Sequence, residues 1–302
     1  MRIVSVGEIL WDVIDKNEYL GGAPLNFAAH AQKLGHEVFP LSAVGADKRG
    51  RKALDLLKDR GMSTEFVQVL PNKPTGTAEV ELDMEGKPTF RIVRPVAYDF
   101  VDLTDQELKR FAELQPDWIY LGTLYHMSTH SLGSTKKLLK AAPKARRFYD
   151  VNLREGHWSL ATTEQLSALA TVIKRSDSEA ESLDASVDAS EGPGHSIEDF
   201  CRRWCGRFDC KTICVTFGER GCAILKDGQY SQAPGYHVTV ADTVGAGDAF
   251  SAAFVHALSQ GWDAEHIASC ANAVGALVAS RSGAIPDWSI ADAHTLMKAQ
   301  AR

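Results

Sequence analysis

The chain has 302 residues, of which 44% are hydrophobic and 24% charged, with a formal net charge of −6. This length suits one large domain with a sizeable core. The acidic balance, without a run of Lys or Arg, argues against nucleic acid as a partner, and no run of about 18 apolar residues indicates a membrane span. Residues 1–10 lack the basic start and cleavage site of a secretory signal, so we expect a cytoplasmic protein.

The first part of the chain alternates between strand and helix patterns. Residues 2–7 are expected to form a buried strand, and residues 25–34 a helix that Gly35 ends. A strand over residues 38–44 and a helix over residues 48–60 follow. This order is typical of an α/β protein with a parallel sheet.

The stretch after residue 64 interrupts this alternation. Thr77–Met84 alternates apolar and polar residues, and Phe90–Val93 continues as a second strand after a turn. We expect a small β-sheet lid formed from about residues 12–21 and 64–98. The apolar face of such a lid needs cover, which makes a homodimer through the lid plausible. The alternative is that the hairpin extends an edge of the main sheet.

The alternation then resumes and continues to the end of the chain. A single domain over residues 1–302 is therefore expected, with a central, mostly parallel sheet flanked by helices on both faces. Expected strands are 118–122, 147–151, 212–216 and 223–226, and expected helices are 105–113, 131–141, 163–173, 197–207, 246–260, 264–280 and 290–299.

The cysteines allow two interpretations. Four of them cluster between residues 201 and 214, which could indicate a metal site, but no C-x-x-C pair occurs. Cys201 and Cys205 fall on an expected helix, and Cys214 falls in an apolar strand. Reduced, buried thiols are therefore the expectation. The six positions are Cys201, Cys205, Cys210, Cys214, Cys222 and Cys270.

The sharpest motif is DTVGAGDAF at residues 242–250. Gly245, Ala246 and Gly247 directly precede an expected helix, whose free N–H groups and dipole can bind a phosphate or a developing oxyanion. Asp248 lies in the first turn, where a carboxylate could simply offset the helix dipole. An Asp with an ordinary pKa near 3.9 is also ionised at neutral pH, so it can take the proton from an attacking hydroxyl. No P-loop or G-x-G-x-x-G motif occurs.

The second motif is GGAPLNFAA at residues 21–29. Two glycines free the backbone, and Pro24 suits the first position of a helix. Asn26 falls in the first turn, where it can bind a hydroxylated ligand. A plain strand-to-helix connection is the alternative.

The two motifs together resemble the signature segments of ribokinase-like (PfkB) carbohydrate kinases, in the order and at the spacing typical of that family. The resemblance extends over nearly the whole chain and includes SAVGADKRG (42–50), VTFGERG (215–221) and ANAVGALVASRSGA (271–284). It implies a ribokinase-like fold and the transfer of the γ-phosphate of ATP to a sugar hydroxyl, with Mg²⁺ and, in some members, K⁺.

The resemblance also implies roles for individual residues around the acceptor sugar. Asp248 matches the catalytic base, and the amides of Gly245, Ala246 and Gly247 match the anion hole. Asp12 matches the acidic residue that holds sugar hydroxyls, and Gly22, Asn26 and Gly45 resemble further contacts.

Three more residues are candidates for the same pocket. Asn152 and Arg154 follow an expected strand, where ligands of α/β sheets gather, so they could reach phosphate or sugar. Arg91 on the lid could close over the substrate, although a solvated arginine is an equal alternative.

Further residues resemble the nucleotide and metal sites of the family. Thr216, Gly218 and Gly221 match a phosphate loop, and Asn272 matches a residue beside the adenine. The family often has Asn-x-x-Glu at its Mg²⁺ site, whereas this chain has Ser176 at the Asn position and keeps Glu179. We expect Lys174 and Ser176 to contact ATP and Glu179 to bind Mg²⁺ through water. Asp242 and residues 280–283 resemble monovalent-cation loops.

The acceptor is less sharply defined. GEILWDVI, YLGTL and DVNLREGHW look most like bacterial fructokinases, which favours fructose. Kinases of 2-keto-3-deoxygluconate share a similar segment, and ribose or a nucleoside are further alternatives. A non-catalytic sugar- or nucleotide-binding regulator is the alternative outside enzymes, and the intact Asp248 argues against it.

Overall fold

The large sheet forms the centre of the protein. The structure is a computed structural model that describes residues 1–14, 17–82, 88–187 and 197–300. The strands of this sheet are β1 (Arg2–Val6), β4 (Glu37–Gly45), β5 (Phe66–Leu70), β8 (Trp118–Gly122), β9 (Arg146–Asp150), β10 (Val172–Ser176), β11 (Thr212–Thr216), β12 (Cys222–Lys226) and β13 (Gln229–Ala233).

The topology of this sheet is mostly parallel. Within the described residues the order is β13-β12-β11-β10-β9-β8-β1-β4-β5. The pairings from β5 to β11 are parallel, whereas β12 and β13 are antiparallel additions at one edge. The expected α/β fold with a mostly parallel sheet is therefore confirmed. The structure contains no helix in its described part that is long and apolar enough to cross a bilayer.

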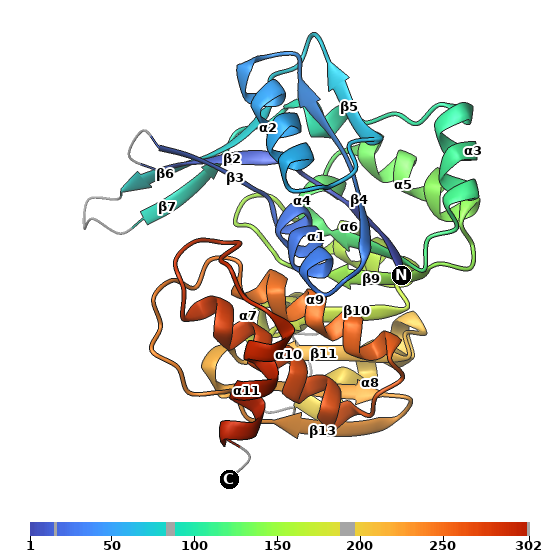
Figure 1. Ribbon diagram of the computed structural model, residues 1–302. Helices are drawn as coiled ribbons and strands as arrows, with labels where there is room; N and C mark the ends of the chain where they lie inside the picture. The colour runs from blue at the N-terminus through green and yellow to red at the C-terminus, as the bar shows by residue number, and fades with distance from the viewer. Residues whose placement is uncertain (15–16, 83–87, 188–196, 301–302) are drawn as a thin grey trace.

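Helices cover both faces of the sheet (Figure 1). One face carries α1 (Ala23–Lys33), α2 (Lys48–Asp59), α9 (Ala246–Ser259), α10 (Ala264–Ala279) and α11 (Ile290–Gln300). The other face carries α3 (Asp105–Leu114), α4 (Thr123–His126), α5 (Thr129–Ala141), α6 (Leu160–Leu169), α7 (Asp177–Val187) and α8 (Ile197–Phe208).

The buried strand residues divide between two hydrophobic clusters, one on each face. Ile3 packs in the first cluster and Val4 in the second, because successive side chains of a strand point to opposite sides. Trp118 and Ile119 of β8 divide in the same way. A parallel sheet covered on both faces needs this continuous run of apolar residues.

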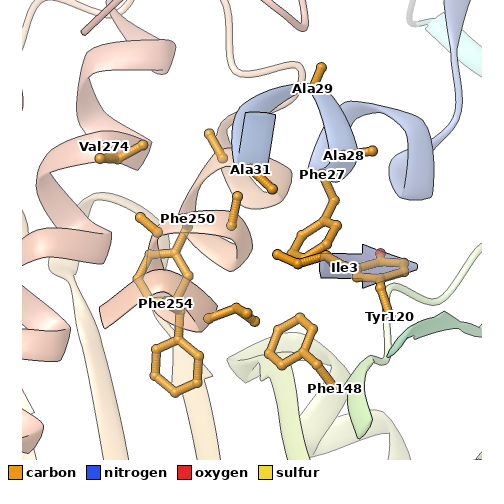
Figure 2. Packing of buried hydrophobic residues seen from close by; sticks show 14 of the residues in the cluster. Ile3, Phe27, Ala28, Ala29, Ala31, Tyr120, Phe148, Phe250, Phe254 and Val274 are labelled. Carbon is orange, nitrogen blue, oxygen red and sulfur yellow. The ribbon is translucent and has the colours of Figure 1, made fainter. Parts of the chain in front are cut away.

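Aromatic packing in the first cluster holds α1 beside α9 (Figure 2). The rings of Phe27 on α1 and Tyr120 on β8 lie 4.5 Å apart, and Phe148 on β9 stacks between this pair and Phe254 on α9. Truncating such a ring to Ala costs about 3–5 kcal/mol. This packing fixes the starts of α1 and α9, where both glycine-rich motifs lie.

One sequence prediction about secondary structure was wrong. The helix expected over residues 163–173 is α6, which spans Leu160–Leu169 and is followed by strand β10. The charged residues Lys174 and Arg175 obscured the strand pattern of β10. Both side chains are nevertheless buried, so this strand is covered on both faces like its neighbours.

A smaller sheet projects from the main body (Figure 1). Within the described residues it has the order β3-β2-β6-β7, with β2 (Leu10–Ile14), β3 (Asn17–Gly21), β6 (Gly76–Leu82) and β7 (Pro88–Ile92). The expected lid range of 64–98 was too wide, because β5 pairs with β4 in the large sheet.

The predicted lid-to-lid dimer depends on the apolar face of Thr77–Met84. Ala78 on that face is buried. Met84 lies outside the described residues, as do the side chains of Val80 and Leu82. Pairing of two copies through the lid stays a prediction.

Candidate active site

The glycine-rich motifs border a cavity of about 350 Å³ between the small sheet and the main body. We call it the carboxylate cavity, because Glu8, Asp12 and Asp248 line it. Its other lining residues are Leu10, Gly22, Ala23, Asn26, Ala78, Ile92, Leu124, Asn152, Arg154, Lys174, Thr243, Val244, Gly245 and Gly247.

Asp248 lies in the first turn of α9, at the wall of this cavity. The helix begins after Gly245, whose φ of 79° is in the left-handed region. A Cβ at Gly245 would stand 2.2 Å from the carbonyl oxygen of Ala284, so the turn requires glycine. Burial raises the pKa of Asp248 to about 6, although the Asn26 hydrogen bond opposes that rise. Asn26 Nδ2 donates to Asp248 Oδ2 over 2.8 Å.

Most of the residues predicted to bind the sugar lie together around this cavity. Asp12 comes from β2, and Gly22 and Asn26 come from the start of α1. Asn152 and Arg154 follow β9. Burial raises the pKa of Asp12 to about 6, against the opposing charge of Arg154.

Two predicted sugar contacts lie elsewhere. The backbone N–H of Gly45 donates to Thr75 Oγ1, and a Cβ at Gly45 would stand 2.5 Å from the carbonyl oxygen of Lys73. Gly45 therefore packs against a neighbouring loop. Arg91 forms an ion pair with Glu79 across β6 and β7 and is exposed. Neither residue lines the carboxylate cavity within the described chain.

Lys174, which was predicted to contact ATP, lines the carboxylate cavity and belongs to a buried network that sequence reasoning missed. Lys174 Nζ donates to both oxygens of Asp150, over 3.1 and 3.3 Å, and Ser251 Oγ donates to Asp150 Oδ2 over 2.7 Å. The Asp150 side chain is fully buried. Lys174 Nζ also lies 3.6 Å from the position that a Cβ on Gly247 would occupy. The network thus places the Lys174 ammonium, paired with Asp150, beside the amides at the start of α9.

Sequence reasoning also missed Glu8. It follows β1, is 4% exposed and lines the carboxylate cavity. Burial raises its pKa to about 7. Its Oε2 atom has no hydrogen-bond partner among the described residues. An isolated carboxylate after a strand gives no sequence signal that separates it from a surface residue.

A second cavity of about 460 Å³ lies on the other side of the α9 start. We call it the loop cavity, because glycine-containing loops form much of its wall. It contains the predicted nucleotide residues Thr216, Gly218, Gly221 and Asn272. Gly247 lines both cavities. The rest of its wall comprises Glu219, Gly235, Tyr236, His237, Val238, Val240, Thr243, Ala246, Phe250, Gly275, Ala276 and Ala279.

The predicted Mg²⁺ residue Glu179 connects two loops at the ends of β9 and β10. Its Oε1 accepts from Leu153 N over 2.7 Å, and its Oε2 accepts from Ser176 N over 2.8 Å. No group of three metal-ligating side chains occurs in the described residues. Mg²⁺ commonly binds to proteins through one or two carboxylates together with water and phosphate, and its binding near Glu179 stays a prediction.

The predicted monovalent-cation residue Asp242 connects segments that are far apart in sequence. Its Oδ1 accepts from Val244 N, and its Oδ2 accepts from Gly283 N, both over 3.0 Å. The structure thus brings Asp242 and the 280–283 segment together. Cation binding there stays a prediction.

Comparison with known proteins agrees with this architecture. A family model described as pfkB family carbohydrate kinase matches residues 3–291. The probable fructokinase-5 of Arabidopsis thaliana is 30% identical over 334 residues, covering 99% of this chain and 98% of that protein.

Solved structures show the same fold. The ATP-bound fructokinase of Xylella fastidiosa superposes with a TM-score of 0.85 at 23% identity, covering 100% of this chain and 99% of that one. The fructokinase of Vibrio cholerae, solved with fructose, ADP and a calcium ion, gives a TM-score of 0.79 at 24% identity, covering 98% of both chains.

The chain therefore belongs to the pfkB family of carbohydrate kinases, and the resemblance drawn from its two glycine-rich motifs is confirmed. It is a sugar kinase, and the family and fold imply ATP as its phosphoryl donor.

Proposed function

We propose that this sugar kinase phosphorylates fructose, with the sugar in the carboxylate cavity and ATP in the loop cavity. The observation that carries this proposal is the position of Gly247, which lines both cavities, with Asp248 directly after it on the sugar side. A transferred phosphoryl group at this junction would lie between its donor and its acceptor.

The residues at the junction have complementary tasks. Asp248 removes the proton from the attacking hydroxyl, and the oxygen then attacks the γ-phosphate in line. The amides from Gly245 to Gly247 and the ammonium of Lys174 stabilise the negative charge that develops on the phosphoryl oxygens. Asn26 orients the Asp248 carboxylate through its hydrogen bond. Mg²⁺, held near Glu179 through water, would neutralise phosphate charge when bound.

The charges of the carboxylate cavity favour a neutral acceptor. Glu8, Asp12 and Asp248 line the cavity together with Arg154. Carboxylates outnumber that guanidinium even with Glu8 half protonated, since its pKa is about 7. Lys174 does not shift this balance, because Asp150 already pairs with it. Carboxylates hold sugar hydroxyls by accepting hydrogen bonds, and they repel an acidic sugar. The fructokinase relatives also support fructose.

An acidic sugar such as 2-keto-3-deoxygluconate is the second candidate. Arg154 favours it, because a guanidinium binds a carboxylate in a bidentate geometry. Ribose and nucleosides are neutral alternatives that the charge argument does not separate from fructose.

The test is ATP consumption by the purified protein with Mg²⁺ across fructose, 2-keto-3-deoxygluconate, ribose, glucose and adenosine. We expect the highest kcat/KM with fructose. Faster turnover of the acid would overturn the charge argument while keeping the role of Asp248. No turnover with any acceptor would contradict the proposed catalytic site.

A further inference from the structure

The end of α8 brings two cysteines into contact, far along the sheet from the cavities described above. After α8 ends at Phe208, Asp209 adopts a φ of 52° in the left-handed region, and the chain reverses. This reversal returns Cys210 to the last turn of α8, where Cys205 lies. The two Sγ atoms are 2.9 Å apart. A disulfide bond of about 2.05 Å needs them to approach by only about 0.9 Å more.

The pair is open to small solutes on one side. Cys205 is partly exposed, whereas Cys210 is only 5% exposed. Both line a surface cavity of about 460 Å³, together with Arg202, Lys211 and Asp227. A small oxidant in this cavity meets Cys205 first, with Cys210 directly behind it.

A buried guanidinium lies on the inner side of the pair. Arg175 on β10 is fully buried, and its three side-chain nitrogens have no hydrogen-bond partner among the described residues. Its guanidinium carbon lies 4.0 Å from the ring centroid of Trp204 and 5.0 Å from that of Phe200. Its charge interacts with the Cys210 thiol. Tyr149, Glu179 and Cys201 interact with the same guanidinium, and a desolvated cation favours a thiolate nearby.

The electrostatics of Cys210 show why this cation matters. The contact with Cys205 and the burial of the thiol both raise the pKa of Cys210, and the Arg175 charge opposes that rise. The Arg175 charge therefore favours the Cys210 thiolate, although the pKa of this thiol stays above its usual value.

We infer that Cys205 and Cys210 form an oxidation site, which takes a hydroperoxide and yields a reversible intramolecular disulfide. The Cys205 thiolate attacks the peroxide, forming a sulfenic acid and releasing water or an alcohol after protonation. The Cys210 thiolate, stabilised by Arg175, then attacks the Cys205 sulfur and displaces hydroxide, which leaves as water. Both thiols together lose two electrons and two protons to the peroxide, and a thiol reductant reverses the reaction.

The other cysteines provide internal controls. Cys201, Cys214, Cys222 and Cys270 are all fully buried. Cys214 and Cys222 lie on the adjacent strands β11 and β12, so proximity alone does not distinguish them from Cys205 and Cys210. We therefore expect these four cysteines to remain reduced under conditions that oxidise Cys205 and Cys210.

The experiment treats the full chain with hydrogen peroxide, alkylates the remaining thiols after denaturation, and records intact and peptide masses. We expect two alkylation sites to be lost, a mass decrease of about 2 Da for the bond itself, and full recovery with a reductant. Trypsin cleaves after Arg203, Arg207 and Lys211. The disulfide should thus appear as peptide 204–207 linked to peptide 208–211.

Matched variants test the two cysteines and Arg175 separately. Cys205→Ser and Cys210→Ser should each abolish the linked peptide, whereas Cys270→Ser should leave it unchanged. Arg175→Met should slow disulfide formation roughly tenfold, the change in thiolate fraction that one pKa unit produces, and Arg175→Lys should retain most of the rate.

Three results would overturn the inference. These are a linked pair elsewhere in the chain, irreversible oxidation of Cys205 without a disulfide, and no oxidation at all. Equal rates in wild type and Arg175→Met would remove Arg175 from the site. Circular dichroism of each variant checks that the fold is retained.

Discussion

The two cavities that meet at the start of α9 differ in their chemistry. The carboxylate cavity contains Glu8, Asp12, Asp248, Arg154 and Lys174. The loop cavity has mostly small and apolar walls, with Glu219, Tyr236 and His237 as its ionisable residues within the described chain. The first cavity therefore offers charges and directed hydrogen bonds to a ligand, and the second offers mainly its shape.

This difference indicates how a sugar kinase divides its tasks. A sugar presents hydroxyl groups in every direction, so its site needs many polar partners that each fix one orientation. A nucleotide base presents a flat, largely apolar surface, which small residues such as Gly275 and Ala276 can accommodate. Substitutions in the first cavity should therefore change rate and acceptor choice, and substitutions in the second should change ATP affinity.

The largest effect is expected at Asp248. Asp248→Asn keeps the size of the side chain but cannot accept the proton, so kcat should fall by about 10²- to 10⁴-fold. Steady-state kinetics with the best acceptor measures this, and ATP binding by calorimetry is the control that should stay near wild type. A variant with normal turnover would exclude Asp248 as the base.

The next effect concerns Lys174 and separates its catalytic role from its structural role. Lys174→Met should lower kcat by about 10²- to 10³-fold, because it removes a stabilising charge beside the phosphoryl group. It also leaves Asp150 buried and unpaired, which should cost about 3–5 kcal/mol in the free energy of unfolding. The double variant with Asp150→Asn should recover stability in urea but not activity. Recovery of both would show that Lys174 acts only through stability.

The pH dependence of kcat tests the electrostatics of the same cavity. Since burial raises the pKa of Asp248 to about 6, the carboxylate is lost as the pH falls through 6. The rate should then drop by about tenfold per pH unit. Asp12 and Glu8 titrate in the same range, so a second variant is needed.

The variant Asn26→Ala distinguishes the ionisation of Asp248 from those of Asp12 and Glu8. It removes the hydrogen bond that opposes the rise in the Asp248 pKa, so the acid limb should move to higher pH. If the acid limb of the kcat profile stays at the same pH in this variant, the ionisation that controls kcat belongs to another group.

A moderate effect is expected at Glu8. Glu8→Gln preserves the shape of the side chain and removes its charge, so KM for fructose should rise about 10- to 100-fold, as for the loss of a charged hydrogen bond. The ratio of kcat/KM for fructose to kcat/KM for 2-keto-3-deoxygluconate should decrease at the same time. Identical losses with both acceptors would point to a structural role only.

The smallest effect is expected in the loop cavity. Gly275→Leu places a side chain in the cavity from α10, where the nearest atoms to a Cβ are 3.4 Å or more away. KM for ATP should rise about tenfold, equivalent to roughly 1.4 kcal/mol. KM for the sugar should stay constant, and a parallel rise in both would contradict the separation of the two cavities.

The accuracy of sequence reasoning depended on whether a residue's role is local. Gly245, Gly247 and Asp248 act through the conformation of one turn, so their motif could be interpreted without the fold. Lys174 and Asp150 are 24 positions apart and become neighbours only through the parallel register of β9 and β10. Because the expected helix over residues 163–173 overlapped the start of β10 and no strand was predicted there, this pairing could not be predicted.

Sequence reasoning missed Glu8 and wrongly assigned Gly45 to the sugar site, and both errors have the same cause. Glu8 was overlooked because its burial depends on α1, which packs over it from another part of the chain; a Cβ on Gly22 would stand 2.5 Å from the Glu8 carbonyl. Gly45 was expected at the sugar, but contacts with residues 73–75 explain its glycine instead. Long-range packing decided both cases.

The division of the hydrophobic core into two clusters has a consequence for how this enzyme can change. Side chains on opposite faces of the sheet share few neighbours, so the stability effects of substitutions on the two faces should add. The face with α1 and α9 holds both glycine-rich motifs, whereas the face with α3 to α8 lies behind the sheet. Four residues of the second cluster, Leu10, Ala78, Ile92 and Leu124, also line the carboxylate cavity. Evolution, or a protein engineer, could therefore stabilise the rest of the second face and use that reserve to tolerate costly changes of specificity at the cavity.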